Sequence, residues 1–179
     1  LRRFRPALNV TANTESMKSE AAKRGVELKF ADGQSKQENQ IRAIRSFIAQ
    51  RVDAIVLAPI VVSGWDPVLR EAKRARIPVI IMDRKIQTTD ESLYTAFIGS
   101  DFYKEGEMAA QWLAKNAGDR TKIVELQGEP GSAAANERRR AFGEAIAKHP
   151  QLQIIDSQTG NFRRADGKQR MGALLRKHR

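Results

Sequence analysis

The sequence contains no cysteine and few aromatic residues. None of its 179 residues is Cys, and Phe, Trp and Tyr together make up 6%. Without cysteine the chain forms neither a disulfide framework nor a cysteine-based metal site. This absence fits an oxidising and a reducing compartment equally well. Because aromatic residues are scarce, any aromatic side chain expected at the surface is a candidate for binding.

The sequence also lacks the apolar runs that membranes and export signals require. No run approaches the roughly 20 residues of a bilayer span. The opening stretch, LRRFRPALNV, is basic but has neither the apolar core nor the small-residue cleavage site of a secretory signal. Since the chain starts with Leu rather than Met, we expect a processed or partial product.

Groups for catalysis are equally scarce. The two histidines, His149 and His178, stand at or near the ends of expected helices, where a cation meets the helix dipole favourably. The stretch LQGEPGSA follows a strand but lacks the third glycine and the Lys-Ser/Thr ending of phosphate loops. No nucleophile–base pair and no metal-ligand spacing is present. We therefore expect a protein that is not an enzyme and holds no cofactor or metal.

The charge is strongly basic, with 32 Lys and Arg against 21 Asp and Glu, a net charge of +11. Such a balance invites a nucleic-acid partner. However, the basic residues are spread over the polar faces of nearly every expected helix, and only ERRRAF at 137–142 concentrates them. Zinc-finger spacing and RNA-recognition signatures are absent. We expect no nucleic-acid partner.

Helical and strand patterns alternate along the chain. The 3.6-residue period and the helix start and stop signals predict helices over 11–25, 35–51, 65–76, 101–118, 132–149 and 164–178. Alternating or continuous apolar runs predict strands over 26–32, 53–59, 77–83, 94–100, 122–128 and 152–160. Strands separated by helices of this length pair in parallel through right-handed crossovers. The fold class is α/β, with doubly wound parallel sheets.

One connection breaks this alternation. Between the strands at 77–83 and 94–100 stands RKIQTTDESL, which is too polar for a crossover helix. We place a lobe boundary just after this irregular connection, near residues 94–102, with a first lobe over residues 1–101 and a second over 102–179.

Ligands of open α/β sheets lie beyond the carboxyl ends of the strands. This rule selects Gln34, the pair Asp83–Arg84, and Asn161 with Phe162. Carboxylate and amide oxygens beside guanidinium donors suit hydroxyls that both donate and accept, and an aromatic face packs against a sugar ring. We expect a polyhydroxylated neutral ligand. Asp83 and Arg84 could also be the polar start of a surface loop, and Phe162 an ordinary core residue.

Four stretches in this order and spacing make the chain recognisable: ADGQSKQENQIRAIRSFIAQRVDAIVLAP, GWDPVLREAKRARIPVIIMDR, VELQGEPGSAAANERRRAF and SQTGNFRRADG. The sequence resembles the type I periplasmic sugar-binding proteins of the ribose-binding family, most closely their galactofuranose-binding members. The resemblance runs from about residue 11 to the end. It implies a two-lobed fold that clamps a monosaccharide between the lobes, a periplasmic location, and an ABC-transporter permease as membrane partner.

The resemblance also assigns residues. Asp83 and Arg84 match a strand-end pair that binds sugar hydroxyls, and Phe162 matches an aromatic that packs on the sugar. Arg138 matches the Arg of an R-x-x-G-F pattern, although Ala141 replaces the glycine; a solvated helix charge is the alternative. Trp65 opens a helix near the strand ends and is a further candidate, with packing in the core as the alternative.

Two departures from the family suggest an incomplete copy. The opening strand of the first lobe is missing or replaced, and the later strands of the second lobe are absent. We therefore expect impaired sugar binding and a tendency to associate. The alternative function is the effector-binding domain of a lac-repressor family regulator, which shares the fold but carries a DNA-binding segment ahead of it.

Overall fold

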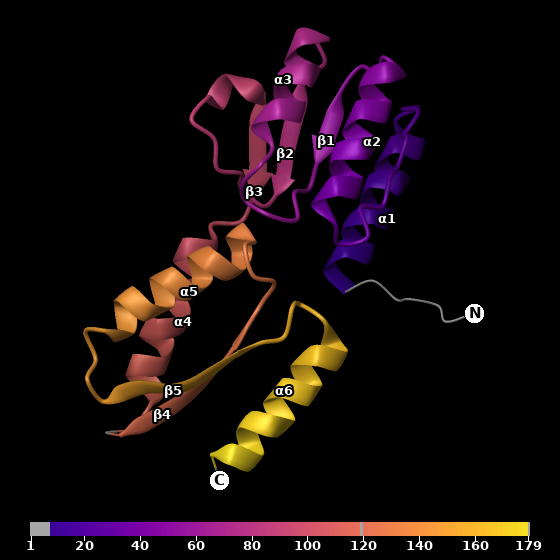
Figure 1. Ribbon diagram of the computed structural model, residues 1–179. Coiled ribbons are helices and arrows are strands. Elements are labelled where there is room, and N and C mark those ends of the chain that lie inside the picture. The colour runs from indigo at the N-terminus through magenta and orange to yellow at the C-terminus, as the bar shows by residue number, and fades with distance from the viewer. Residues whose placement is uncertain (1–7, 119, 179) are drawn as a thin grey trace.

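The computed structural model describes residues 8–118 and 120–178, with side chains from residue 12 onward within those ranges. Figure 1 shows two groups of elements along the chain. The first contains α1 (Leu8–Lys23), α2 (Gln37–Ala49), β1 (Ile55–Leu57), α3 (Asp66–Arg74), β2 (Val79–Asp83), the 3-10 turn η1 (Glu91–Leu93) and β3 (Ala96–Gly99). The second contains α4 (Phe102–Asn116), β4 (Thr121–Gln127), α5 (Ala133–Ile146), β5 (Leu152–Thr159) and α6 (Arg164–Lys177).

Both sheets are parallel. β1, β2 and β3 lie in that order, with Leu57 opposite Ile81 and Ile81 opposite Phe97. β4 pairs with β5, and a bulge shifts the register after Ile123. The predicted α/β class with parallel sheets is confirmed. The carboxyl ends of the strands in the first sheet point toward the second group (Figure 1).

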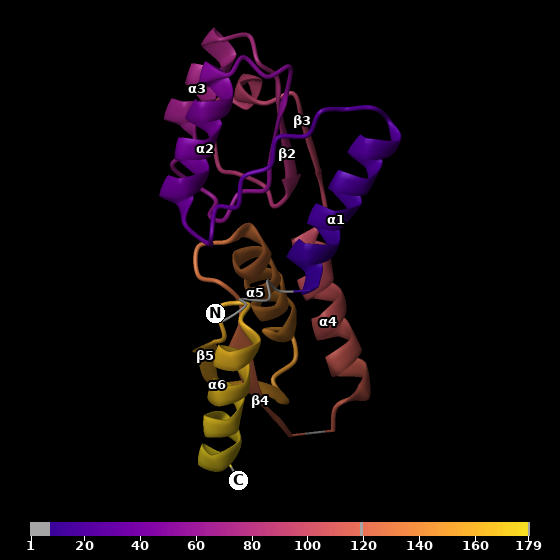
Figure 2. The same ribbon diagram turned by 90° about the vertical axis from the view of Figure 1, so that its right-hand side faces the viewer.

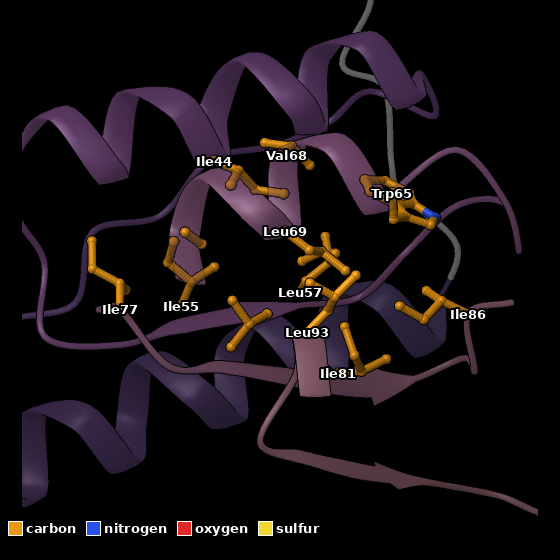
Figure 3. Packing of buried hydrophobic residues seen from close by; sticks show 12 residues of the cluster. Ile44, Ile55, Leu57, Trp65, Val68, Leu69, Ile77, Ile81, Ile86 and Leu93 are labelled. Carbon is orange, nitrogen blue, oxygen red and sulfur yellow. The ribbon is translucent and has the colours of Figure 1, made fainter. Parts of the chain in front are cut away.

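The main core lies between the first sheet and the helices α2 and α3. Ile55, Leu57, Val79 and Ile81 point from the strands into this core. Ile44 of α2 and Val68 and Leu69 of α3 meet them from above the sheet (Figure 3). Burial of one such aliphatic side chain contributes about 1.5–3 kcal/mol. The first sheet is therefore anchored on one face by these two helices.

The core of the second group is smaller and is built around a close helix pair. α4 and α5 meet through small residues, among them Gly106, Ala110 and Ala141. Ile123 of β4 and Leu152 of β5 pack against these helices. Figure 1 shows α6 on the other side of the β4–β5 pair from α4 and α5.

The predicted strand at 26–32 does not form. Residues 26–32 are in no helix or strand, and Val26, Leu28 and Phe30 are 57%, 37% and 52% exposed. Their backbone makes a single hydrogen bond in the described chain, from the N–H of Val26 to the carbonyl of Ala21. The alternating pattern alone cannot make a strand, because a strand needs a neighbour to pair with.

The other face of the first sheet is poorly covered. Figure 2 shows α1 on the side of the sheet opposite α2 and α3. Yet Val56 of β1 and Ile98 of β3 remain 43% and 64% exposed on that face. β1 is also an edge strand of the sheet. This side of the molecule thus combines an unpaired strand edge with exposed apolar side chains.

Candidate functional site

The loops that follow the strands of the two sheets touch one another. After β1, the N–H of Val62 donates to the carbonyl of Gly131, which follows β4, at 3.0 Å. The Val62 side chain packs against Phe102, Ala133 and Ala134 of the second group. The carboxyl ends of the two sheets therefore face each other across a direct contact, where ligands of such sheets bind.

β2 ends in a tight turn centred on Asp83. Asp83 has a φ of +65°, and the N–H of Arg84 donates to the carbonyl of Met82 at 2.7 Å. A hydrogen bond between residues two apart defines a three-residue turn, which is strained when its central φ is positive. Strain of this kind at a strand end indicates a functional constraint on the residues that it aims.

The turn directs Arg84 across to the second group. Its Nε lies 3.5 Å from the Asp83 carboxylate, and its Nη1 donates to the carbonyl of Ile60 at 3.4 Å. Its guanidinium lies 5.4 Å from the ring centroid of Phe162, which follows β5. Only 17% of the Arg84 side chain is exposed. The pairing of guanidinium and ring is a cation–π contact, and it joins the ends of β2 and β5.

Phe162 and its neighbour Asn161 form the second part of the site. Both have left-handed backbones, with φ of +51° and +52°. Asn tolerates this conformation, whereas for a bulky residue such as Phe it is a genuine outlier. Phe162 is 39% exposed, so part of the ring is available to a ligand.

Arg138 of α5 is held from the side of α4. Its Nε donates to Glu105 at 2.7 Å, and its guanidinium lies 4.6 Å from the ring centroid of Phe102. Phe102 in turn packs against Val62, so Arg138 lies beside the contact between the two groups. The side chain is 42% exposed, and among the described side chains no hydrogen bond engages its Nη donors, which suit a hydroxyl.

Trp65 and Gln34 lie elsewhere. Trp65 is fully buried in the core of the first sheet, and its indole N–H donates to the carbonyl of Val61 at 2.8 Å. A side chain with no exposed surface cannot touch a ligand, so its role is packing (Figure 3). Gln34 sits in an exposed turn, where its own N–H donates to the Asp32 carboxylate at 2.8 Å. The structure brings neither residue to Arg84 and Phe162.

Two glutamines of α2 were not found by sequence reasoning. Gln40 donates to the carbonyl of Ala58 at 2.7 Å and accepts from the N–H of Ile60 at 3.1 Å. Gln37 donates to the carbonyl of Ser63 at 2.6 Å. These bonds hold the loop that carries Ile60 and Val62 to the site. Their positions in a polar run gave no signal, because the acceptors are backbone groups distant in sequence.

The side chains that meet here can donate to, accept from and stack on a ligand. The combination suits a neutral ring with hydroxyls and carries no nucleophile with a base. Across residues 8–118 and 120–178, no group of three His, Asp or Glu side chains is placed to hold a metal ion. In the same residues no helix has the length and apolarity to cross a bilayer. One surface hollow, of about 370 Å³, lies on α5 beside Asn136 and Arg139, and none of the predicted site residues line it.

Parallel sheets whose strand ends face each other across a direct contact define an α/β binder of the two-lobed class. Residues 11–179 match the family model described as a periplasmic binding protein domain. The chain belongs to this family, which is one of binding proteins and not of enzymes.

Three relatives illustrate the similarity. The galactofuranose-binding protein YtfQ of Escherichia coli K12 is 50% identical over 166 residues, which cover 92% of this chain and 52% of the relative. A solved periplasmic binding protein component of the arabinose ABC transporter from Shewanella sp. ANA-3, bound to α- and β-L-arabinofuranose, is 52% identical with a TM-score of 0.90; the match covers 93% of this chain and 55% of that one. A Mycobacterium smegmatis structure in complex with β-D-fucofuranose is 51% identical with a TM-score of 0.89; the match covers 94% of this chain and 56% of that one. The chain thus spans about half the length of these relatives.

Proposed function

We propose that this chain is part of the solute-binding component of an ABC-type sugar importer in the periplasm, and that its ligand is a monosaccharide in the furanose form. Residues 1–101 form one lobe and residues 102–179 the first part of another. The single observation that carries the proposal is the contact of Arg84 with Phe162 at the facing strand ends. The furanose preference is supported by the three relatives above, which bind or are named for furanoses.

Each residue has a chemical task in this proposal. Asp83, 48% exposed, accepts hydrogen bonds from sugar hydroxyls, and Arg84 donates to neighbouring hydroxyls with its planar guanidinium. Arg138 supplies further donors from the second lobe. The exposed part of the Phe162 ring packs on the C–H face of the sugar. Partial burial of Arg84 strengthens its hydrogen bonds, because water competes less for its donors.

The membrane permease of the importer is the macromolecular partner in this proposal. The alternative, an effector-binding domain of a transcriptional regulator, would use the same site for a sugar signal. The relatives quoted above are binding proteins, and one is a component of an ABC transporter, which favours transport.

The test is a sugar titration followed by saturation-transfer NMR, which detects weak binding. L-Arabinose and D-galactose, which both include furanose forms in solution, are compared with D-glucose and myo-inositol. We expect saturation transfer to the first two sugars and a loss of affinity of about tenfold to a hundredfold in Arg84→Ala, since a hydrogen bond to a charged group contributes about 1.5–3 kcal/mol.

The matched control is Lys85→Ala, which removes the neighbouring charge on an exposed side chain. This variant should bind as the unmodified chain does. Equal losses in both variants, or equal transfer to all four sugars, would argue against the proposed site.

A further inference from the structure

The turn that carries Phe162 is held by a side chain at the end of β5. The Thr159 hydroxyl lies 2.7 Å from the carbonyl of Gly128 and 3.0 Å from Oδ1 of Asn161, and it has one hydrogen for these two acceptors. Both acceptors lie within hydrogen-bond distance, so this one hydrogen is shared between the Gly128 carbonyl and the Asn161 amide oxygen. The hydroxyl oxygen also accepts from the backbone N–H of Asn161 at 3.2 Å. Thr159 therefore ties the start of the turn to the end of β4.

The amide of Asn161 is used inside the turn. Its Nδ2 donates to the carboxylate of Asp166, in the first turn of α6, at 3.0 Å. The side chain thus links the turn to the following helix. With the nitrogen committed to Asp166 and Oδ1 beside the Thr159 hydroxyl, the amide is engaged by protein on both ends.

The absence of a side chain at Gly128 leaves room for the ring. A Cβ built at Gly128 would overlap the Cζ and Cε1 atoms of Phe162, and it would lie 2.7 Å from Cε2. The ring thus lies directly on the backbone at the end of β4 while its cation–π contact reaches Arg84 at 5.4 Å. Two consecutive left-handed residues are costly, so the neighbours must hold them in place.

We infer that Asn161, together with Thr159 and Asp166, positions the Phe162 ring over Arg84, and that Asn161 does not itself bind the ligand. This inference rests on the proposed function, which it deepens by separating the residue that contacts the sugar from those that aim it. A ring held in advance presents a fixed face to a ligand, so less ordering is needed when the ligand binds.

The test reads the position of the ring without any sugar. A guanidinium that lies over an aromatic ring has its side-chain protons shifted upfield by the ring current. NMR of the whole chain with labelled arginine reports this shift for Arg84, and its loss in Phe162→Leu assigns the signal. We expect the shift to be lost or halved in Thr159→Val and in Asp166→Ala, while amide signals of the first sheet stay unchanged.

Two further variants distinguish a specific effect on the position of the Phe162 ring from a general loss of structure. Asp166→Asn keeps an oxygen that can accept from Asn161, so it should restore most of the shift. Thr121→Val removes an equivalent hydroxyl bond, to the carbonyl of Gly118 at 3.1 Å, at the far end of β4, and should leave the shift intact. An upfield shift that persists in both Thr159→Val and Asp166→Ala overturns the inference.

Sugar affinity provides the second readout. Loss of one neutral hydrogen bond predicts up to about tenfold weaker binding in Thr159→Val, and Asn161→Asp, which still accepts from Thr159 but cannot donate to Asp166, should weaken it similarly. If the unmodified chain binds none of the sugars while the ring-current shift is present, the proposed function fails and the positioning role is still decided by the shift.

Discussion

Gly106 of α4 lies directly against the backbone of Arg138 in α5. A Cβ at Gly106 would overlap the carbonyl oxygen of Arg138 and lie 2.9 Å from its Cα. Because the neighbour is backbone, no side-chain rotation can relieve the overlap. The glycine therefore sets the distance between the two helices, and with it the position of the Arg138 guanidinium over Phe102.

Substitution of Gly106 by Ala should destabilise the chain. Alanine favours a helix by about 1 kcal/mol over glycine, but overpacking costs about 1–3 kcal/mol, and at a backbone contact the upper part of that range applies. Gly143→Ala in α5 is the matched control, since nothing lies within 4 Å of its Cβ, and it should be stabilised. Urea unfolding measures both, and a stabilised Gly106→Ala would contradict the packing argument.

The two tryptophans should respond oppositely to truncation. Trp65 is fully buried, whereas Trp112 of α4 is 67% exposed. Trp65→Ala should lower the free energy of unfolding by about 3–5 kcal/mol because it leaves a cavity, and Trp112→Ala should change it by less than about 0.5 kcal/mol. Chemical denaturation followed by circular dichroism makes the comparison. Similar losses in the two variants would be inconsistent with the burial of Trp65.

Acid should weaken the attachment of α6 to β5. Hydrogen bonds from His178 and then Lys177, at 2.8 and 2.6 Å, hold the pKa of the Asp156 carboxyl well below its usual range. A carboxyl with a lowered pKa in the folded state stabilises the fold above its unfolded pKa of about 3.9. That stabilisation is lost as the pH falls below this value toward the folded pKa.

The measurement for Asp156 is urea unfolding between pH 7 and pH 3. The unmodified chain should lose more stability over this interval than Asp156→Asn, which cannot ionise. Asp53→Asn, at an exposed position of the first sheet's group, should keep the full pH dependence. Identical pH profiles for the unmodified chain and Asp156→Asn would show that the Asp156 carboxylate does not cause the loss of stability in acid.

The exposed segment at 26–32 and the edge of β1 should make the chain self-associate and bind sugar weakly. Val26, Leu28 and Phe30 offer an apolar face, and an unpaired strand edge is a template for further pairing. The apparent molar mass of the isolated chain, measured by light scattering, should rise with protein concentration. The double variant Leu28→Thr with Phe30→Thr should reduce this rise. Neither side chain is in the core, so stability should hardly change. A monodisperse chain that binds arabinose or galactose with micromolar affinity would refute this prediction.

Sequence reasoning predicted a strand correctly where the apolar pattern is accompanied by neighbouring strands that pair with it. The run VIIM predicted a buried strand, and β2 lies between β1 and β3 as such a run requires. The pattern at 26–32 was equally regular, but pattern does not reveal whether a partner strand is present. The interpretation of Trp65 was wrong for a related reason. A residue that opens a helix near the strand ends can point into the core or toward a ligand, and the packing of α3 on the sheet decides which.

The site shows the same limit. The strand-end rule brought Asp83, Arg84 and Phe162 onto one short list, and the structure places Arg84 over Phe162. The rule could not foresee the strained turn at Asp83 or the use of the Asn161 amide by Asp166, because both depend on backbone geometry. Whether these residues hold a sugar stays a prediction.

The extended stretch after α1 has a consequence for the lifetime of the chain. Proteases bind their substrates as extended backbone, and residues 24–32, which are in no helix or strand, are exposed throughout. Arg24 and Lys29 lie within this stretch, so trypsin should nick the chain there before it reaches the helices of either group. A cut at this point would release α1 from the first sheet while β1, β2 and β3 keep their shared ladder. In a cell, the same stretch would be open to attack by proteases.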